Sequence, residues 1–209
     1  MSLAEPVRLV EGQVAASGAV LARAFANDPF FTYVLPDPVE RERLMPPIMA
    51  AWTRYGLLFG EVYVTAGPVE ASVIWLPPSD AIGRSEERRD RAGLTAVVSA
   101  FSDGARARYD AMGQHLGRIR EAAPALPHWH LPWMGVDPAR HGLGLGSLLL
   151  RAGLSRIDQD GVECRLFTDQ PRNVPLYQRY GFEIAAEGDV PDGGPHVRYM
   201  RRGPHPVTP

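Results

Sequence analysis

The hydrophobic positions along the chain follow two periods, one typical of helices and one typical of strands. Between residues 13 and 26 the apolar positions fall on one helical face, and a second long helix is expected after two proline breaks. Short apolar runs bounded by turn residues predict strands. The expected elements are strands 7–11, 61–66, 70–76, 130–136 and 163–168 and helices 13–26, 39–59 and 147–157.

Residues 84–122 differ from the rest because they are charged, rich in arginine and helical by composition. A solvated helical face is the ordinary interpretation of such a stretch. The whole length of 209 residues is enough for one well-buried α/β domain. We therefore expect a single domain over 1–203 with a helical insertion at 84–122, followed by a disordered tail at 204–209.

Charge and cysteine content exclude several classes. The formal net charge of −2 argues against general nucleic-acid binding, which usually requires a basic patch. The one cysteine, Cys164, lies in an expected buried strand, where a packing role is far commoner than a nucleophilic one. The N-terminus shows no leader pattern, and no run approaches the about 18 apolar residues of a membrane span. These features predict a cytoplasmic protein without nucleic-acid or membrane partners.

Three glycines at alternate positions, Gly142, Gly144 and Gly146, stand between strand 130–136 and helix 147–157. Without a Cβ atom, glycines let the backbone come close to a ligand. The first-turn N–H groups of the helix then face that ligand, and the helix dipole favours an anion such as a phosphate. The segment therefore predicts binding of a phosphorylated cofactor.

Other glycine-rich loops fit this segment less well. A dinucleotide fingerprint has the spacing G-x-G-x-x-G near the start of a βαβ unit, whereas the spacing here is G-x-G-x-G. A P-loop needs a lysine after its glycines, and this sequence contains no lysine. A nucleotide-dependent oxidoreductase would rest on the glycines alone, and a tight strand–helix connection without a ligand is the other alternative.

A second segment downstream completes a recognisable pair. The residues that carry the pattern are Val136, Pro138, His141, Gly144 and Gly146, followed by Asn173, Tyr177, Gly181 and Phe182. Together the two segments resemble the GNAT superfamily of acyl-CoA-dependent N-acetyltransferases. Within it, residues 171–182, 190–193 and 199–201 look like the subgroup of puromycin N-acetyltransferase and its relatives.

The resemblance implies an α/β (α+β) fold. Its central mixed, mostly antiparallel sheet would have about six to seven strands, be flanked by helices, and be splayed at the cofactor-binding strands. It also implies acetyl-CoA (coenzyme A) as cofactor and direct acetyl transfer to a small-molecule amine, such as a puromycin-like or other antibiotic or metabolite amine. The insertion at 84–122 would be a lid over the acceptor site. The protein would be a monomer or a homodimer.

Two residues are implied as catalytic. Tyr177 stands at the family position of the general acid, and a phenol with its ordinary pKa of about 10 can protonate a leaving thiolate. His128 and His130 share one face of their strand, and His130 lies near the register of a proton relay, where a histidine titrates close to neutrality. A core tyrosine and a structural histidine are the alternatives. Asp28 and Glu70 are acidic candidates for the base.

The remaining positions implied by the resemblance bind ligands. The main chain of 134–136 would pair with the pantetheine amides as an added strand does, and Asn173 would hydrogen-bond the same arm. No metal ligand is expected. The implied cofactor-binding residues are Met134, Gly135, Val136, His141, Gly142, Leu143, Gly144, Leu145, Gly146, Ser147, Asn173 and Tyr177.

Aromatic residues could line an apolar acceptor pocket, although such a set is more often core, and Tyr180 is expected to be core. The candidates are Phe30, Phe31, Tyr33, Trp75 and Trp133.

The loop departs from the family pattern at two positions. His141 replaces the usual Gln or Arg, and Leu143 replaces an often basic residue. Cofactor affinity would therefore depend more on backbone amides. An acyl-CoA-binding regulator, or a degenerate GNAT protein without turnover, is the alternative function.

Overall fold

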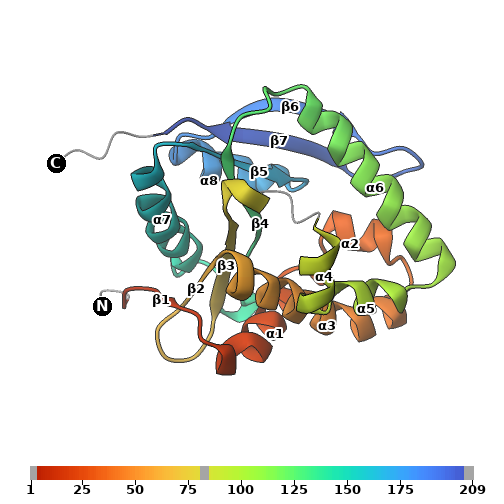
Figure 1. The fold of residues 1–209 in the computed structure, drawn as a ribbon. Helices are drawn as coiled ribbons and strands as arrows, with labels where there is room; N and C mark the ends of the chain where they lie inside the picture. The colour runs from red at the N-terminus through yellow and green to blue at the C-terminus, as the bar shows by residue number, and fades with distance from the viewer. Residues whose placement is uncertain (1–3, 81–84, 205–209) are drawn as a thin grey trace.

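The computed structural model describes residues 4–80 and 85–204, and within them seven strands form one sheet (Figure 1). Its order is β1-β2-β3-β4-β5-β7-β6. Only the β4–β5 pair is parallel among the neighbouring pairs of this sheet. The expected mixed, mostly antiparallel sheet of six to seven strands is confirmed. The bounds are β1 Val7–Arg8, β2 Glu61–Val64, β3 Ala71–Leu76, β4 His128–Val136, β5 Glu163–Thr168, β6 Glu183–Asp189 and β7 His196–Arg202.

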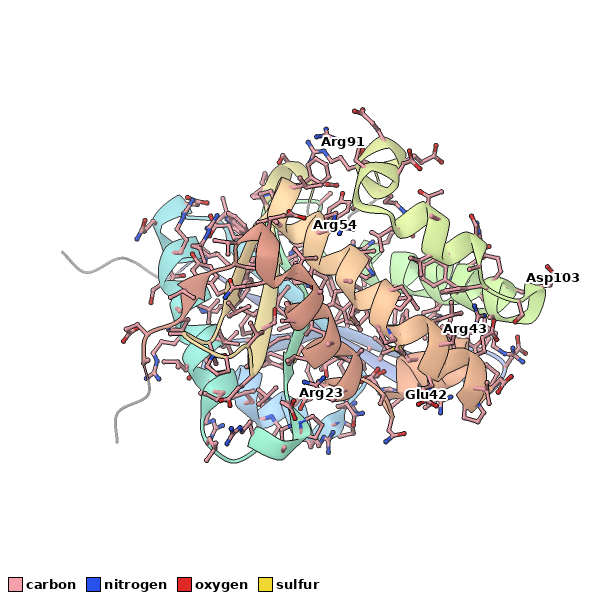
Figure 2. All side chains as sticks on the ribbon, turned by 90° about the horizontal axis from the view of Figure 1, so that it is seen from below. Arg23, Glu42, Arg43, Arg54, Arg91 and Asp103 are labelled. Atoms are coloured by element: carbon pink, nitrogen blue, oxygen red, sulfur yellow. The ribbon has the colours of Figure 1, made fainter. Side chains whose placement is uncertain are left out.

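Helices cover both faces of the sheet (Figure 1). One face carries α7 and α8, and the other carries α1, α2 and α3. The helices α4 and α5 pack on α3, while α6 lies against β6 and β7. Charged side chains of the outer helices, such as Arg43 on α3, point away from the sheet (Figure 2). The bounds are α1 Val14–Ala24, α2 Pro29–Val34, α3 Pro38–Phe59, α4 Glu86–Ala92, α5 Leu94–Ser99, α6 Asp103–Glu121, α7 Leu145–Ile157 and α8 Val174–Arg179.

The expected elements are present with shifted ends. The first strand is shorter than expected, because Glu11–Gln13 turns into a 3-10 helix. The fourth strand begins two residues earlier than expected, at His128, and α7 begins at Leu145. The expected insertion folds as α4, α5 and α6, but its residue 84 and residues 205–209 of the expected tail lie outside the described residues.

Close packing of α1 on α3 and β3 fixes one layer of helices. A Cβ atom at Gly18 would lie 2.7 Å from the Cα atom of Ala50, so only glycine permits this helix–helix distance. The neighbouring Ser17 hydroxyl donates to Ser72 at 2.7 Å and lies 3.2 Å from the Thr53 hydroxyl. These contacts join α1, α3 and β3 within an apolar core. Burying the hydroxyl groups costs little stability because each has a hydrogen-bond partner.

On the other face, α7 packs on the indole of Trp75, and this contact yields a prediction. A Cβ atom at Gly153 would lie 2.6 Å from Trp75 Cζ2. We expect Gly153→Ala to lower the free energy of unfolding by about 1–3 kcal/mol, as overpacked cores do. Urea unfolding followed by circular dichroism measures the change.

Gly113→Ala on α6 is the matched control, because nothing lies within 4 Å of its added methyl group. There the same exchange should stabilise the protein by about 0.5–1 kcal/mol, since alanine is the better helix former. Equal stabilities for the two variants would contradict the packing described here.

Candidate active site

The strands β4 and β5 separate halfway along their length. Their parallel pairing ends at Leu131 and Leu166, whereas β4 stays paired with β3 as far as Val136. A bulge puts one extra β4 residue at this point, and Pro132 beside it has no N–H group to donate. One edge of β4 is therefore open from residue 132 onward, which confirms the expected splay.

A cavity of about 760 Å³ lies at this splay. Its walls come from the separating ends of β4 and β5, from α2 and α3, from α4 to α6, from α8, and from Phe25 directly after α1. Aromatic side chains dominate the lining, with a few polar groups among them. The lining residues used below are Phe30, Phe31, Trp133, Met134, Phe167, Asp28, Asp169, His130, Asn173 and Tyr177.

The glycine loop leads from β4 into α7 in the conformation that its sequence predicts. Gly142 and Gly144 have φ values of +80° and +81°, which side-chain-bearing residues rarely adopt. Gly144 is the N-cap residue, and the first N–H bonded back to it is that of Leu148, at 3.0 Å. The N–H groups of 145–147 thus precede the first donor that the helix itself can satisfy, and helix N-termini of this kind favour anions.

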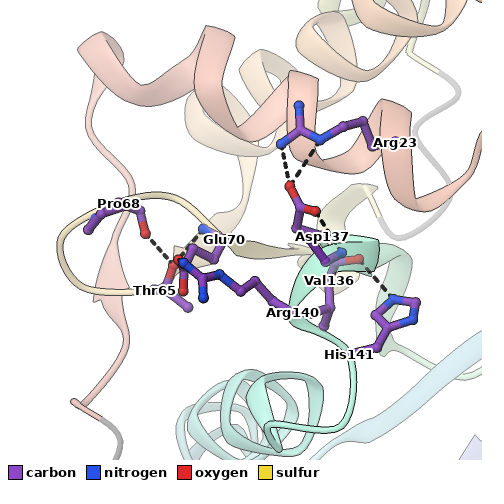
Figure 3. Close-up of polar contacts among 9 residues, drawn as sticks. Arg23, Thr65, Pro68, Glu70, Val136, Asp137, Arg140 and His141 are labelled. Carbon is purple, nitrogen blue, oxygen red and sulfur yellow. Dashed lines mark hydrogen bonds and ion pairs between the residues drawn. The ribbon is translucent and has the colours of Figure 1, made fainter.

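Side chains around the loop form contacts within the protein (Figure 3). Asp137 accepts hydrogen bonds from the Ala139 N–H group and from Arg23 of α1, at 3.0 and 2.6 Å.

Two further contacts hold the loop in the same way (Figure 3). Arg140 pairs with Glu70 at 2.7 Å, and His141 Nε2 lies 3.1 Å from the Val136 carbonyl oxygen, to which it donates. Glu70 is therefore engaged in an ion pair and does not line the cavity. These contacts leave the backbone amides at the start of α7 as the polar groups that the loop offers to a ligand.

Tyr177 lines the cavity from α8, and its side chain is only 5% exposed. Its ring packs edge-on against Phe182. Burial raises the pKa of its phenol, and the nearby carboxylates of Asp28 and Asp169 raise that pKa further. The phenol thus stays protonated at every physiological pH and keeps a proton available. Any basic limb from this phenol lies above the ordinary tyrosine range.

His130 lines the same cavity, but the expectation that it titrates near neutrality is wrong. It is 7% exposed and packs against Phe167. Burial lowers the pKa of its imidazole to about 3, and the charges of Arg120 and His128 contribute. His128 is held by the Leu126 carbonyl oxygen, 2.8 Å from its Nδ1. His130 is therefore neutral at pH 7 and a weak base.

Two carboxyl groups meet at the cavity wall, and the sequence analysis identified only one of them. Asp28 caps α2, and Asp169 follows directly after β5. The N–H group of Phe30 donates to Asp28 Oδ1 at 3.1 Å and to Asp169 Oδ2 at 2.7 Å. Burial raises the pKa of both carboxyls, and the charge of Asp169 raises that of Asp28 further. The position of Asp169 at a strand end, close to Asn173, is the signal that could have identified it.

The aromatic candidates divide between the two faces of the sheet. Phe30, Phe31 and Trp133 line the cavity, as expected. Trp75 does not, because it points to the opposite face and packs under α7. Tyr33 lies outside the lining, and its hydroxyl donates to the Pro191 carbonyl oxygen at 3.3 Å. The period-two pattern alone could not tell which face of β3 the cavity occupies.

Comparison with known proteins agrees with this geometry. Residues 102–184, which include the glycine loop, Asp169 and Tyr177, match the family described as "Acetyltransferase (GNAT) domain". This similarity covers the part of the chain from α6 to the start of β6. A mycothiol acetyltransferase of Kytococcus sedentarius is 34% identical over 113 residues, which are 53% of this chain and 35% of that protein. The match thus spans about a third of the length of that relative.

Solved structures of acetyltransferases share this fold over nearly the whole chain. A protein described as a histone acetyltransferase and related acetyltransferase, from Corynebacterium glutamicum, has a TM-score of 0.70 at 21% identity and covers 99% of this chain and 100% of its own. Arylalkylamine N-acetyltransferase 2 from Aedes aegypti has a TM-score of 0.64 at 11% identity, with coverages of 96% and 99%. At these identities the likeness establishes the fold alone. Among the helices in the described part of the chain, none has the length and apolar character of a membrane span.

The glycine loop yields a prediction about two neighbouring glycines. Gly144→Ala should lower the free energy of unfolding by about 1–2 kcal/mol, because alanine is strained at a φ of +81°. Gly146→Ala should be neutral or stabilising, since its Cβ atom would lie 3.6 Å from Val136 Cγ2, an ordinary contact inside a helix. Thermal unfolding of both variants measures the difference. A destabilised Gly146→Ala beside an unaffected Gly144→Ala would contradict the loop conformation.

Proposed function

We propose that the protein is an acetyl-CoA-dependent N-acetyltransferase that transfers the acetyl group directly to the amine of a small molecule. The observation that carries the proposal is the cavity at the β4–β5 splay, which is lined by Tyr177 and borders the open edge of β4. The match to a GNAT acetyltransferase domain, over residues 102–184, includes both of these strands and supports the proposal. Direct transfer requires an anion site, a strand edge and an acid. In this proposal the start of α7, the open edge of β4 and Tyr177 provide them.

The residues present fit the cofactor. The free amides at the start of α7 would hold its pyrophosphate, because helix N-termini bind such groups. The open edge of β4 at 134–136 would pair with its pantetheine amides, and Asn173 would contact the same arm. When bound there, acetyl-CoA supplies an activated thioester.

Tyr177 would act as the general acid of the reaction. Its buried phenol stays protonated and lines the cavity, so it can donate a proton to the departing thiolate. His130 would contribute polarity to the cavity as a neutral imidazole rather than serve as the base.

The acceptor would be a bulky, partly apolar amine. The aromatic lining favours such a ligand over a flexible polar chain, because buried aromatic area is the main source of binding energy in such pockets. A puromycin-like aminonucleoside is the named candidate from the sequence resemblance. In this proposal residues 1–203 act as one domain, α4 to α6 shape the acceptor end of the cavity, and the protein works in the cytoplasm.

Two measurements test the proposal. Acetyl-CoA should raise the melting temperature, and incubation with an amine panel should release free coenzyme A, detected with a thiol reagent. Lack of acetyl-CoA binding would reject the proposal. Binding without release of coenzyme A across the panel would favour an acyl-CoA-binding regulator, the alternative raised by His141 and Leu143.

Replacement of Tyr177 by phenylalanine tests the acid. The change should lower kcat at least about tenfold with little effect on the apparent affinity for acetyl-CoA, since only the proton donor is lost. Tyr63→Phe on β2, remote from the cavity, is the control and should keep full activity. Near-normal kcat for Tyr177→Phe would show that the thiolate takes its proton from another group.

A further inference from the structure

The carboxyl groups of Asp28 and Asp169 meet at the wall of the cavity. The Phe30 N–H group donates to both side chains, and the two side chains hydrogen-bond each other. Asp28 is only 8% exposed. Two like charges held this close and away from water cannot both ionise without a cost, so one carboxyl retains its proton to higher pH.

A second side chain indicates that this part of the cavity receives a polar ligand. His130 lines the same cavity and is 7% exposed. Among the residues that the structure describes, its buried Nδ1 atom has no hydrogen-bond partner. Buried polar atoms usually have partners, so an unsatisfied one beside a cavity marks a place for a ligand atom.

The carboxyl pair is a stronger base than the histidine. Burial lowers the pKa of His130 to about 3, which makes its imidazole a poor proton acceptor. Burial and the charge of Asp169 raise the pKa of Asp28 far above its ordinary value near 4. A base is effective when its pKa lies close to the working pH, and the pair is therefore the better match.

We propose that the Asp28–Asp169 pair takes the proton from the acceptor's ammonium group, and that the acceptor is a primary alkylamine that enters as a cation. This inference rests on the proposed acetyltransferase function. In the step, an N–H bond of the ammonium breaks and an O–H bond forms on the pair, whose charge changes from −2 to −1. The amine is left neutral with a free lone pair, and the pair returns the proton to solvent before the next turnover.

The surroundings of the pair bear on its titration. Tyr177 of α8 and His130 of β4 line the cavity beside it, and both stay uncharged near neutrality. The Gln170 side chain hydrogen-bonds Asp28. The charged groups of α4 and α6 that line the same cavity are Glu86, Arg89, Asp110 and Arg120.

Asp28→Asn is the first test, because asparagine caps a helix as well as aspartate does. With acetyl-CoA and 2-phenylethylamine, kcat/KM of the wild type should rise with pH through the raised pKa of Asp28. The variant should lose that rise and fall at least about tenfold at the upper plateau. Asp169→Asn should move the rise to lower pH, because it removes the charge that raises the pKa of Asp28. Asp37→Asn is the matched control: Asp37 caps α3 before a proline in the same way, but it is exposed and remote from the cavity.

A second amine separates proton removal from a structural role. Two fluorine atoms on the carbon next to the amine-bearing carbon make β,β-difluoro-2-phenylethylamine far less basic than 2-phenylethylamine. A large share of it is therefore already neutral near pH 7. The loss caused by Asp28→Asn should be much smaller with this amine than with 2-phenylethylamine. An equal loss with both amines would overturn the inference, because a damaged cavity affects both alike.

Thermal unfolding gives a readout that needs no turnover. The folded-state pKa of Asp28 is raised, so the stability it contributes is present at low pH and is lost as pH rises through that pKa. The melting temperature of Asp28→Asn relative to wild type should therefore increase from pH 4 to pH 9, while Asp37→Asn shows no such trend.

The outcomes separate the two proposals. Wild-type turnover with an unchanged pH profile in Asp28→Asn would overturn the carboxyl pair as base and leave the acetyltransferase function standing. Failure of the wild type to acetylate any amine would overturn the proposed function, and this inference with it. A difference in melting temperature between Asp28→Asn and wild type that stays constant across pH would show that the pKa of Asp28 is not raised, and would overturn the carboxyl pair as base.

Discussion

The separation of β4 from β5 is the constraint on which the site depends. At Leu131 the two strands stop pairing, and the bulge beside Pro132 turns β4 away while β3 continues to hold it. Backbone groups released from a sheet must find other partners, so an open strand edge is a ready acceptor for an extended ligand. The same separation makes room for the cavity between Trp133 on one side and Phe167 on the other.

The bulge also determines which side chains face the cavity. Without it, alternate residues of β4 would keep one orientation along the whole strand. With one residue inserted, His130 and Trp133 both line the cavity, although their positions differ by an odd number.

Desolvation is the main electrostatic influence on the cavity. It lowers the pKa of His130, raises that of Tyr177 and raises those of Asp28 and Asp169. Each shift disfavours the charged form, which is the general effect of removing an ionisable group from water. An acid that keeps its proton and a carboxyl pair with raised pKa therefore follow from one cause. In contrast, the ion pairs around the glycine loop are more exposed and serve to anchor it.

The sequence by itself determined the glycine loop, because Gly142 and Gly144 need φ values that other residues avoid. The downstream segment of the same family pattern gave the positions of Asn173 and Tyr177. Hydrophobic period and proline breaks, which are local properties, predicted five of the strands and the longer helices, and the family resemblance implied the mixed sheet. Only the tertiary structure decided the partnership of Asp28 with Asp169, the weak basicity of His130 and the turning of Trp75 to the far face. Those outcomes depend on burial and on contacts between distant segments, and neither can be read from spacing along the chain.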